Sequence, residues 1–133
     1  MPANTEPIFV QVPAQNYVQI ATANTGLDGS GTLGTLATGV ADGKTIEGVR
    51  VKAAGTTTAG MIRFFLSLDG GTTKRLIDEL DVAAITPSAT VKAFSGAIIF
   101  DRPLVLPDTN GILYCATEKA ETFNVFTLGD GDY

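Results

Sequence analysis

Apolar and polar positions alternate along much of the chain, and no window of a dozen residues has the i, i+3, i+4, i+7 spacing of an amphipathic helix. Short alternating segments separated by Gly, Pro and Asp predict about eight β-strands. The first segment spans Tyr17 to Ala23. The apolar positions of the first three segments are Val18 and Ile20, then Leu33 and Leu36, then Ile46, Val49 and Val51. This pattern predicts an all-β, single-domain antiparallel β-sandwich, jelly-roll-like in its strand number.

The clearest pair of strands flanks the turn Asp69-Gly70-Gly71. The apolar positions are Ile62, Phe64, Leu66 and Leu68 before the turn, and Leu76, Leu80 and Val82 after it. Asp78 falls on the apolar side of the second strand. A Gly-rich link between two alternating segments predicts a β-hairpin. Ser67 to Thr73 resembles the Asp box of sialidases, S-x-D-x-G-x-T-W, with Lys74 at the aromatic position, and this resemblance implies a turn remote from catalysis.

The second half of the chain predicts further strands. Thr86-Pro87-Ser88 predicts a turn, residues 91–100 a strand, and residues 104–106 a short segment between Pro103 and Pro107. Residues 112–117 and 123–128 predict a final hairpin. The stretch Ile99-Phe100-Asp101-Arg102-Pro103-Leu104-Val105-Leu106-Pro107, followed by Gly111-Ile112-Leu113-Tyr114, resembles the entry to the penultimate strand of viral and tumour-necrosis-factor-like jelly rolls.

Residues 1–16 differ from the remainder and predict an extended N-terminal arm, followed by the sandwich domain at residues 17–133. Pro2, Pro7 and Pro13 exclude a regular helix, since each lacks an amide donor. The apolar residues between the last two prolines, which we predict to dock on a shell or a neighbouring subunit, are Ile8, Phe9, Val10 and Val12. The alternative is a first strand that completes the domain's own sheet.

Composition argues against several classes of function. The chain of 133 residues has no His, and its single Cys excludes an intrachain disulfide or a Cys-based zinc site. A formal net charge of −5 argues against nucleic-acid binding. No apolar run reaches the roughly 20 residues of a membrane helix, and the first residues do not match a signal peptide. We therefore expect no enzyme activity, no cofactor, no metal, no nucleic acid and no membrane.

Four motifs carry possible chemistry, each with a simpler structural alternative. Gly29-Ser30-Gly31-Thr32-Leu33-Gly34 fits the dinucleotide fingerprint, but a poor helix-forming segment follows it, so a flexible loop is expected. Glu79 and Asp81 share a strand face at about 6–7 Å, a spacing compatible with a glycosidase pair. Calcium could bind Asp130 and Asp132, or Asp28 with Asp42 and Asp108, although solvated turns are the simpler interpretation. Cys115 is expected to be a small buried residue, with an intersubunit disulfide as the alternative.

Three stretches of the sequence carry a further resemblance: Ala21 to Leu36, Val51 to Arg63, and Ala84 to Thr90. Together they resemble small all-β virion structural proteins of tailed bacteriophages, of the capsid decoration (cement) type. This resemblance implies a non-enzymatic protein made in the bacterial host cytoplasm and located on the capsid surface of the virion. Its implied partners are the major capsid protein and copies of itself, as a homotrimer, at capsomer junctions.

Two functions from other classes stay open. A tail, fibre or connector component could recognise host glycans through Tyr17, Tyr114 or Tyr133. A glycoside hydrolase would use Glu79 and Asp81.

Overall fold

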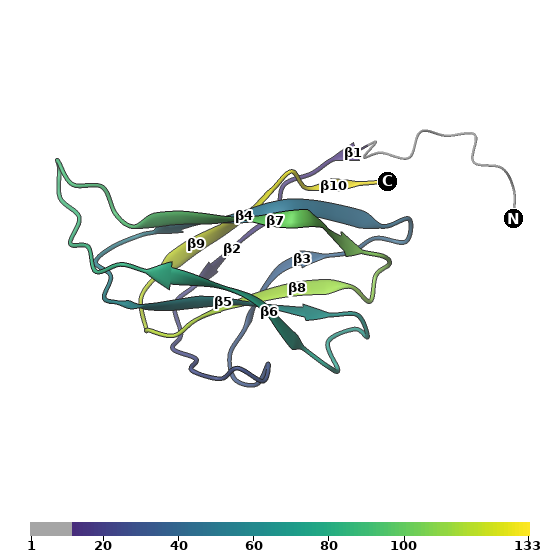
Figure 1. The fold of residues 1–133 in the computed structure, drawn as a ribbon, viewed down its shortest axis with the longest axis horizontal. Coiled ribbons are helices and arrows are strands. Elements are labelled where there is room, and N and C mark those ends of the chain that lie inside the picture. The colour runs from purple at the N-terminus through teal and green to yellow at the C-terminus, as the bar shows by residue number, and fades with distance from the viewer. Residues whose placement is uncertain (1–11) are drawn as a thin grey trace, which may run out of the picture.

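The computed structural model describes residues 12–133, and the ten strands in this range form two sheets (Figure 1). The strands are β1 (Val12–Pro13), β2 (Tyr17–Ile20), β3 (Gly34–Thr38), β4 (Lys44–Ala53), β5 (Gly60–Ser67), β6 (Arg75–Val82), β7 (Ser95–Leu106), β8 (Ile112–Thr117), β9 (Phe123–Leu128) and β10 (Gly131–Asp132). No helix in this range is long and apolar enough to cross a membrane.

The strands pair as a series of nested antiparallel hairpins. β5 pairs with β6, β4 with β7, β3 with β8, β2 with β9, and β1 with β10. The chain is thus one long hairpin, with its tip at the β5–β6 turn, rolled into two layers of order β7-β4-β9-β2 and β3-β8-β5-β6. β10 pairs with the first residues of β4, which β9 leaves unpaired, and β1 pairs with β10 on its other side. This arrangement is a jelly roll, so the predicted β-sandwich fold is confirmed.

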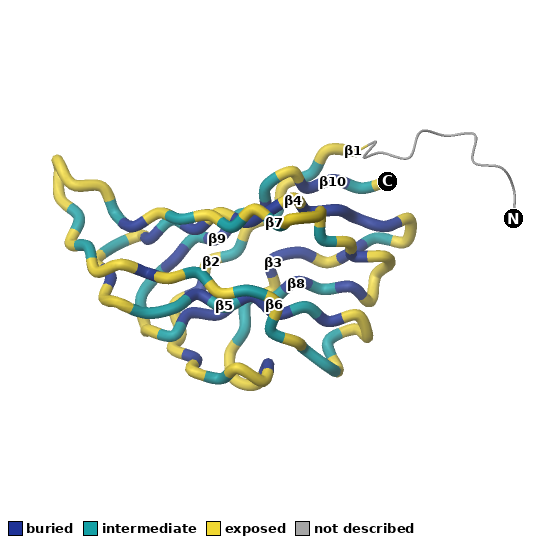
Figure 2. Tube along the Cα trace, in the orientation of Figure 1, coloured by how far each residue is buried: buried dark blue, intermediate teal, exposed yellow. Residues whose placement is uncertain are grey.

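The hydrophobic core fills the space between the two layers. Every second side chain of a strand points inward, which explains why alternating sequence segments build it. The fully buried apolar side chains include Ile46, Val49, Val51, Ile62, Phe64, Leu113, Cys115 and Val125. Figure 2 shows that these buried positions lie on the strands, whereas the loops at both ends are mostly exposed.

The long edge strand β7 differs from the predicted strands. The predictions of a strand over 91–100 and a separate segment at 104–106 are both wrong, because one strand covers Ser95–Leu106. The pairing changes from Gly48–Ile99 to Ile46–Leu104, so residues 100–103 bulge opposite Glu47 alone. Pro103 is tolerated there because a bulge on an edge strand needs no ladder donor. The buried side chain of Phe94 closes the core just before the strand begins.

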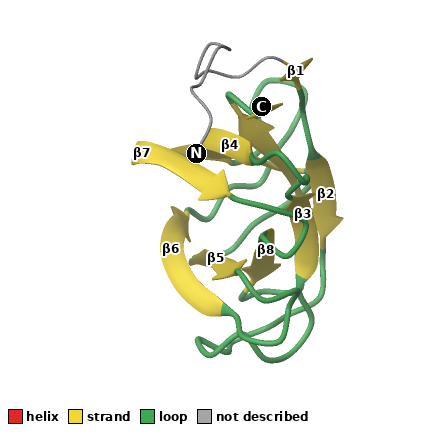
Figure 3. Ribbon diagram, turned by 90° about the vertical axis from the view of Figure 1, so that its right-hand side faces the viewer, coloured by secondary structure: helices red, strands yellow, loops and turns green. Residues whose placement is uncertain are grey.

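Residues 21–33 form a loop beneath the four-stranded sheet (Figures 1 and 3). The predicted strand that begins at Tyr17 therefore ends at Ile20 instead of Ala23. The loop is attached to the end of β8, where the backbone amide of Asn24 donates to the Thr117 carbonyl at 2.8 Å. Gly29 and Gly31 have φ of +84° and +81°, and a strand follows them. Without a helix after the glycines, the loop lacks the anion-binding geometry of a dinucleotide fingerprint.

The last residues of the predicted arm lie in the six-stranded sheet. Val12 and Pro13 pair with Asp132 and Gly131, and the Ala14 amide donates to the Asp130 carbonyl at 3.0 Å. This part of the chain follows the alternative of a strand completing its own sheet. The domain boundary at residues 16–17 stays a prediction.

Candidate interaction surface

The outer face of the six-stranded sheet carries a row of outward-facing side chains across four strands, of which three are large. Strand register places Tyr17, Phe126, Arg50 and Ala97 side by side. Tyr17 is 75% exposed, and its ring centroid lies 6.2 Å from that of Phe126. The Arg50 guanidinium lies over the Phe126 ring, 5.1 Å from its centroid, so a cation–π contact holds it against the sheet.

Two further rows flank this one. On one side the register aligns Leu128, Gly48 and Ile99, and Ile99 is 68% exposed. On the other side Gln19 Nε2 donates to Asn124 Oδ1 at 3.0 Å, beside Lys52. We call the apolar and aromatic part of this surface, together with the arginine that packs on it, the open face; it is defined by Tyr17, Arg50, Ala97, Ile99, Phe126 and Leu128.

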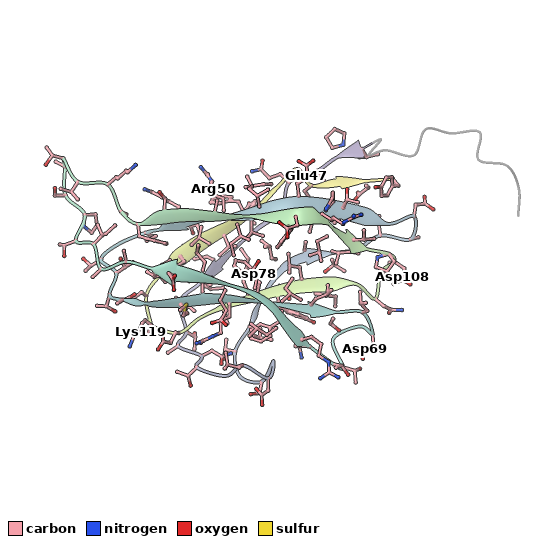
Figure 4. All side chains as sticks on the ribbon, viewed as in Figure 1. Glu47, Arg50, Asp69, Asp78, Asp108 and Lys119 are labelled. Atoms are coloured by element: carbon pink, nitrogen blue, oxygen red, sulfur yellow. The ribbon has the colours of Figure 1, made fainter. Side chains whose placement is uncertain are left out.

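A shallow hollow of about 360 Å³ adjoins the open face at the β7 bulge. Its lining residues are Glu47, Ile99, Phe100, Asp101, Pro103 and Leu128. Figure 4 shows Glu47 and Arg50 projecting from β4 away from the four-stranded sheet. The hollow thus combines an apolar floor with two carboxylates, and the bulge of β7 creates it.

The two outer faces of the sandwich differ in how they are covered. On the four-stranded sheet, Phe65 faces outward yet is fully buried, on the side where the 21–33 loop lies. On the six-stranded sheet no described segment lies across Tyr17 or Ile99. Clustered, exposed apolar side chains on one face are typical of an interaction site.

A buried ion pair lies close to the entry of the N-terminal segment. Lys44 Nζ is 2.9 Å from Asp130 Oδ1 and 2.7 Å from Asp132 Oδ1. Asp130 also accepts hydrogen bonds from Asn16 Nδ2 and Thr127 Oγ1. Burial lowers the pKa of Lys44, but the two carboxylates outweigh this and the net pKa is raised. The Asp130–Asp132 pair therefore holds an ammonium group, and the interpretation of these acids as a solvated turn or calcium loop is wrong.

The other candidate calcium ligands do not form a cluster. Within residues 12–133, no three His, Cys, Asp or Glu side chains are placed to hold a metal ion. Asp28 instead accepts hydrogen bonds from the amide and hydroxyl of Ser30, and these bonds lower its pKa.

The carboxylate pair considered for glycoside hydrolysis lies on the outer side of β6. Glu79 Oε2 is 3.3 Å from Arg63 Nε in a partly exposed ion pair, and Asp81 is exposed. Neither residue lines any of the three hollows at the 68–75 turn, at the β7 bulge and between residues 19–22 and 32–34. Asp78 lies opposite the inward-facing Phe64, as its apolar-side position predicts, and Figure 4 shows it between the layers.

The predicted hairpin turn after Ser67 is held by side-chain hydrogen bonds. Asp69 Oδ1 accepts from the Thr73 amide at 2.9 Å and from Ser67 Oγ at 2.8 Å, and these bonds lower the pKa of Asp69. Gly70 and Gly71 have positive φ, which a glycine adopts without strain. The neighbouring hollow is lined by Asp69 and Thr73 of this turn together with Leu66, Leu68, Arg75 and Ile77 of the flanking segments.

Cys115 is fully buried in the core, as expected, and burial raises the pKa of its thiol to about 12. A thiol in this position has no access to a second chain.

Of the four predicted docking residues, Ile8, Phe9 and Val10 lie outside the described residues. Val12 is 56% exposed in β1, and its docking role stays a prediction. Among the candidate glycan-binding aromatics, Tyr17 is on the open face, whereas Tyr114 is half-buried beneath Lys74. Sequence reasoning missed the open face as a whole. The available signal was an outward-facing apolar residue, such as Ile99, in the middle of an alternating strand.

No known protein family and no curated protein matches the chain. Among solved structures, the CBM22-1–GH10 modules of Clostridium thermocellum xylanase 10B, complexed with xylohexaose, are 17% identical with a TM-score of 0.42; the match covers 93% of this chain and 27% of that one. A chain in the structure of infectious bursal disease virus, Gt strain, is 16% identical with a TM-score of 0.31; the match covers 97% of this chain and 36% of that one. The chain thus spans about a quarter to a third of these proteins, and at this similarity neither bears on its function.

Proposed function

We propose that this chain is a non-enzymatic bacteriophage virion structural protein, a capsid decoration protein that binds the assembled shell at capsomer junctions and stabilises it. The observation that carries this proposal is the open face, an aromatic and aliphatic surface on the outer side of the six-stranded sheet. The resemblance of three sequence segments to small phage virion proteins supplies the identity of the partner, the major capsid protein.

The composition of the open face suits protein contacts. Tyr and Arg are the side chains that most often dominate binding energy at protein interfaces, and here Tyr17 and Arg50 flank Phe126. Ile99 and Leu128 provide apolar area, and the nearby Glu47 and Asp101 provide polar contacts at the rim. A surface of this kind binds a partner without any chemical step.

Shell binding gains strength when several copies act together. A homotrimer places three open faces on one shell, so dissociation requires all three contacts to open at once. The N-terminal residues Ile8, Phe9, Val10 and Val12 add a second apolar contact, to the shell or to a neighbouring copy.

The experiment is co-sedimentation of purified protein with phage particles that lack it. Tyr17→Asp is expected to reduce the bound fraction about tenfold, because a large aromatic side chain that anchors an interface contributes about 2 kcal/mol or more. Leu27→Asp is the matched control, since Leu27 is 55% exposed on the loop of the opposite sheet. Removal of residues 1–11 should also weaken binding while leaving β1 in place. Equal binding of wild type and Tyr17→Asp would overturn the role of the open face.

Glycan recognition by a tail or fibre component is the second candidate. Tyr17 is exposed beside the hydrogen-bonded amides of Gln19 and Asn124, and an aromatic ring next to amides is a surface that sugars can use. A glycan array separates the two functions: a Tyr17-dependent signal supports glycan recognition, and its absence together with particle binding supports decoration.

A further inference from the structure

The outer strand β7 has an unpaired edge. β7 pairs with β4 on one side, and within the described range it has no strand partner on the other. Exposed edges present free amide and carbonyl groups, and a chain in extended conformation can add to them. The bulge at residues 100–103 interrupts regular pairing, which leaves Ser95–Ile99 as the straight part of the edge, about 16 Å long.

The side chains along this edge are apolar on both sides of the sheet. Ile99 points outward at 68% exposure, and Ile98 is half-buried on the core side. Natural edge strands are usually protected by charged residues or covered by other segments. The stretch Ala97–Phe100 has no charged residue. This edge therefore has the properties of an acceptor for another strand.

The chain itself contains a segment whose length and apolar side chains match those of the β7 edge. Residues 8–11, Ile-Phe-Val-Gln, lie between Pro7 and β1, contain no proline and would span about 13 Å when extended. Ile8 and Val10 would share one face of such a strand, with Phe9 on the other, so it would present apolar side chains to both sides of the sheet. Its length fits the straight part of the β7 edge.

In one copy, the strand β1 that follows residues 8–11 lies too far from the β7 edge for those residues to pair with it. β1, from which residues 8–11 continue, lies at one edge of the six-stranded sheet, and β7 lies at the opposite edge. A head-to-tail contact between different copies satisfies both positions, and such contacts form a ring when the rotation between successive copies closes.

We infer that residues 8–11 of one copy add as a strand to the β7 edge, Ser95–Ile99, of a second copy. This inference deepens the self-association in the proposed function and rests on it. The occupant of the edge is a second copy of this chain, and the same contact repeated around a ring gives each copy one donor and one acceptor.

The test uses full-length protein in solution, without particles. Val10→Pro removes one amide donor from the arm, and Ile99→Lys puts a charge on the acceptor edge. Both are expected to convert the oligomer measured by light scattering to monomer, and to increase at least tenfold the hydrogen-exchange rate of the peptide spanning residues 95–100. Ala3→Pro and Leu27→Lys are the matched controls, and both should keep the oligomer.

The outcomes separate the inference from the proposed function. If wild type is oligomeric and both variants keep its mass and its exchange rates, strand addition is wrong while self-association stands. If wild type is monomeric at all concentrations, both strand addition and the predicted homotrimer are wrong. Particle binding through Tyr17 is measured independently of either result.

Discussion

Lys44 and Asp130 form a buried ion pair, 2.9 Å from Nζ to Oδ1, that joins β4 to the two-residue link between β9 and β10. Their side chains are only 4% and 0% exposed. The pair lies where the N-terminal segment enters the sheet, because Asn16 donates to the same carboxylate. It thereby connects both ends of the described chain to a central strand.

Replacing one partner of this pair should destabilise the fold strongly. Lys44→Met leaves Asp130 buried without its cation, and such changes cost about 3–5 kcal/mol. Lys119→Met is the control, because its 4.0 Å pair with Glu118 is partly exposed and should contribute less than about 1 kcal/mol. Urea denaturation gives both values. A loss below about 1 kcal/mol for Lys44→Met would contradict the assigned role.

The raised pKa of Lys44 predicts a loss of stability at alkaline pH. A lysine whose folded pKa exceeds its unfolded value of about 10.4 stabilises the fold fully below that pH and loses this contribution as pH rises through the folded pKa. The stability difference between wild type and Lys44→Met should thus be constant to about pH 10 and shrink above it. A difference that stays constant through pH 11.5 would show that Lys44 is not ion-paired.

The Asp69 turn predicts an effect at acid pH. Because its folded pKa is lowered, Asp69 stabilises the fold above its unfolded pKa of about 3.9, and this contribution is lost as pH falls through the folded value. Asp69→Ala should destabilise the protein at pH 7 and do so to a smaller extent at pH 2. Asp42→Ala, a change of an exposed turn residue with no side-chain hydrogen bond in the described part of the chain, is the control. Equal effects of the two substitutions would contradict this prediction.

Burial of Cys115 predicts an inert thiol. With its pKa raised to about 12, the side chain should not react with Ellman's reagent at pH 8 in the native state, and should react completely in 6 M guanidinium. Non-reducing gels should show no interchain disulfide. Rapid native-state labelling would place the residue outside the core.

The local pattern of the sequence predicts the fold well where each strand has one buried face. Val49 and Val51 point inward and Arg50 outward, as their alternation requires. Phe65 breaks this rule, since it faces the outer side of its sheet, where the 21–33 loop lies (Figure 1), and is nevertheless fully buried. No local pattern reveals such a cover.

The features that the sequence did not predict depend on distant contacts. The β7 bulge is defined by the pairing of Ile46 with Leu104 and of Gly48 with Ile99, which only the assembled sheet determines. The Lys44–Asp130 pair joins residues 86 positions apart, so Asp130 could be interpreted as a solvated turn acid. The open face likewise arises when four strands bring separate outward residues into register.

Thermal release of DNA from phage particles with and without this protein tests the central claim most directly. Particles lacking it should release their packaged DNA at lower temperature, and added wild-type protein should restore the release temperature while Tyr17→Asp should not. An identical release temperature for bare and fully reconstituted particles would contradict the account.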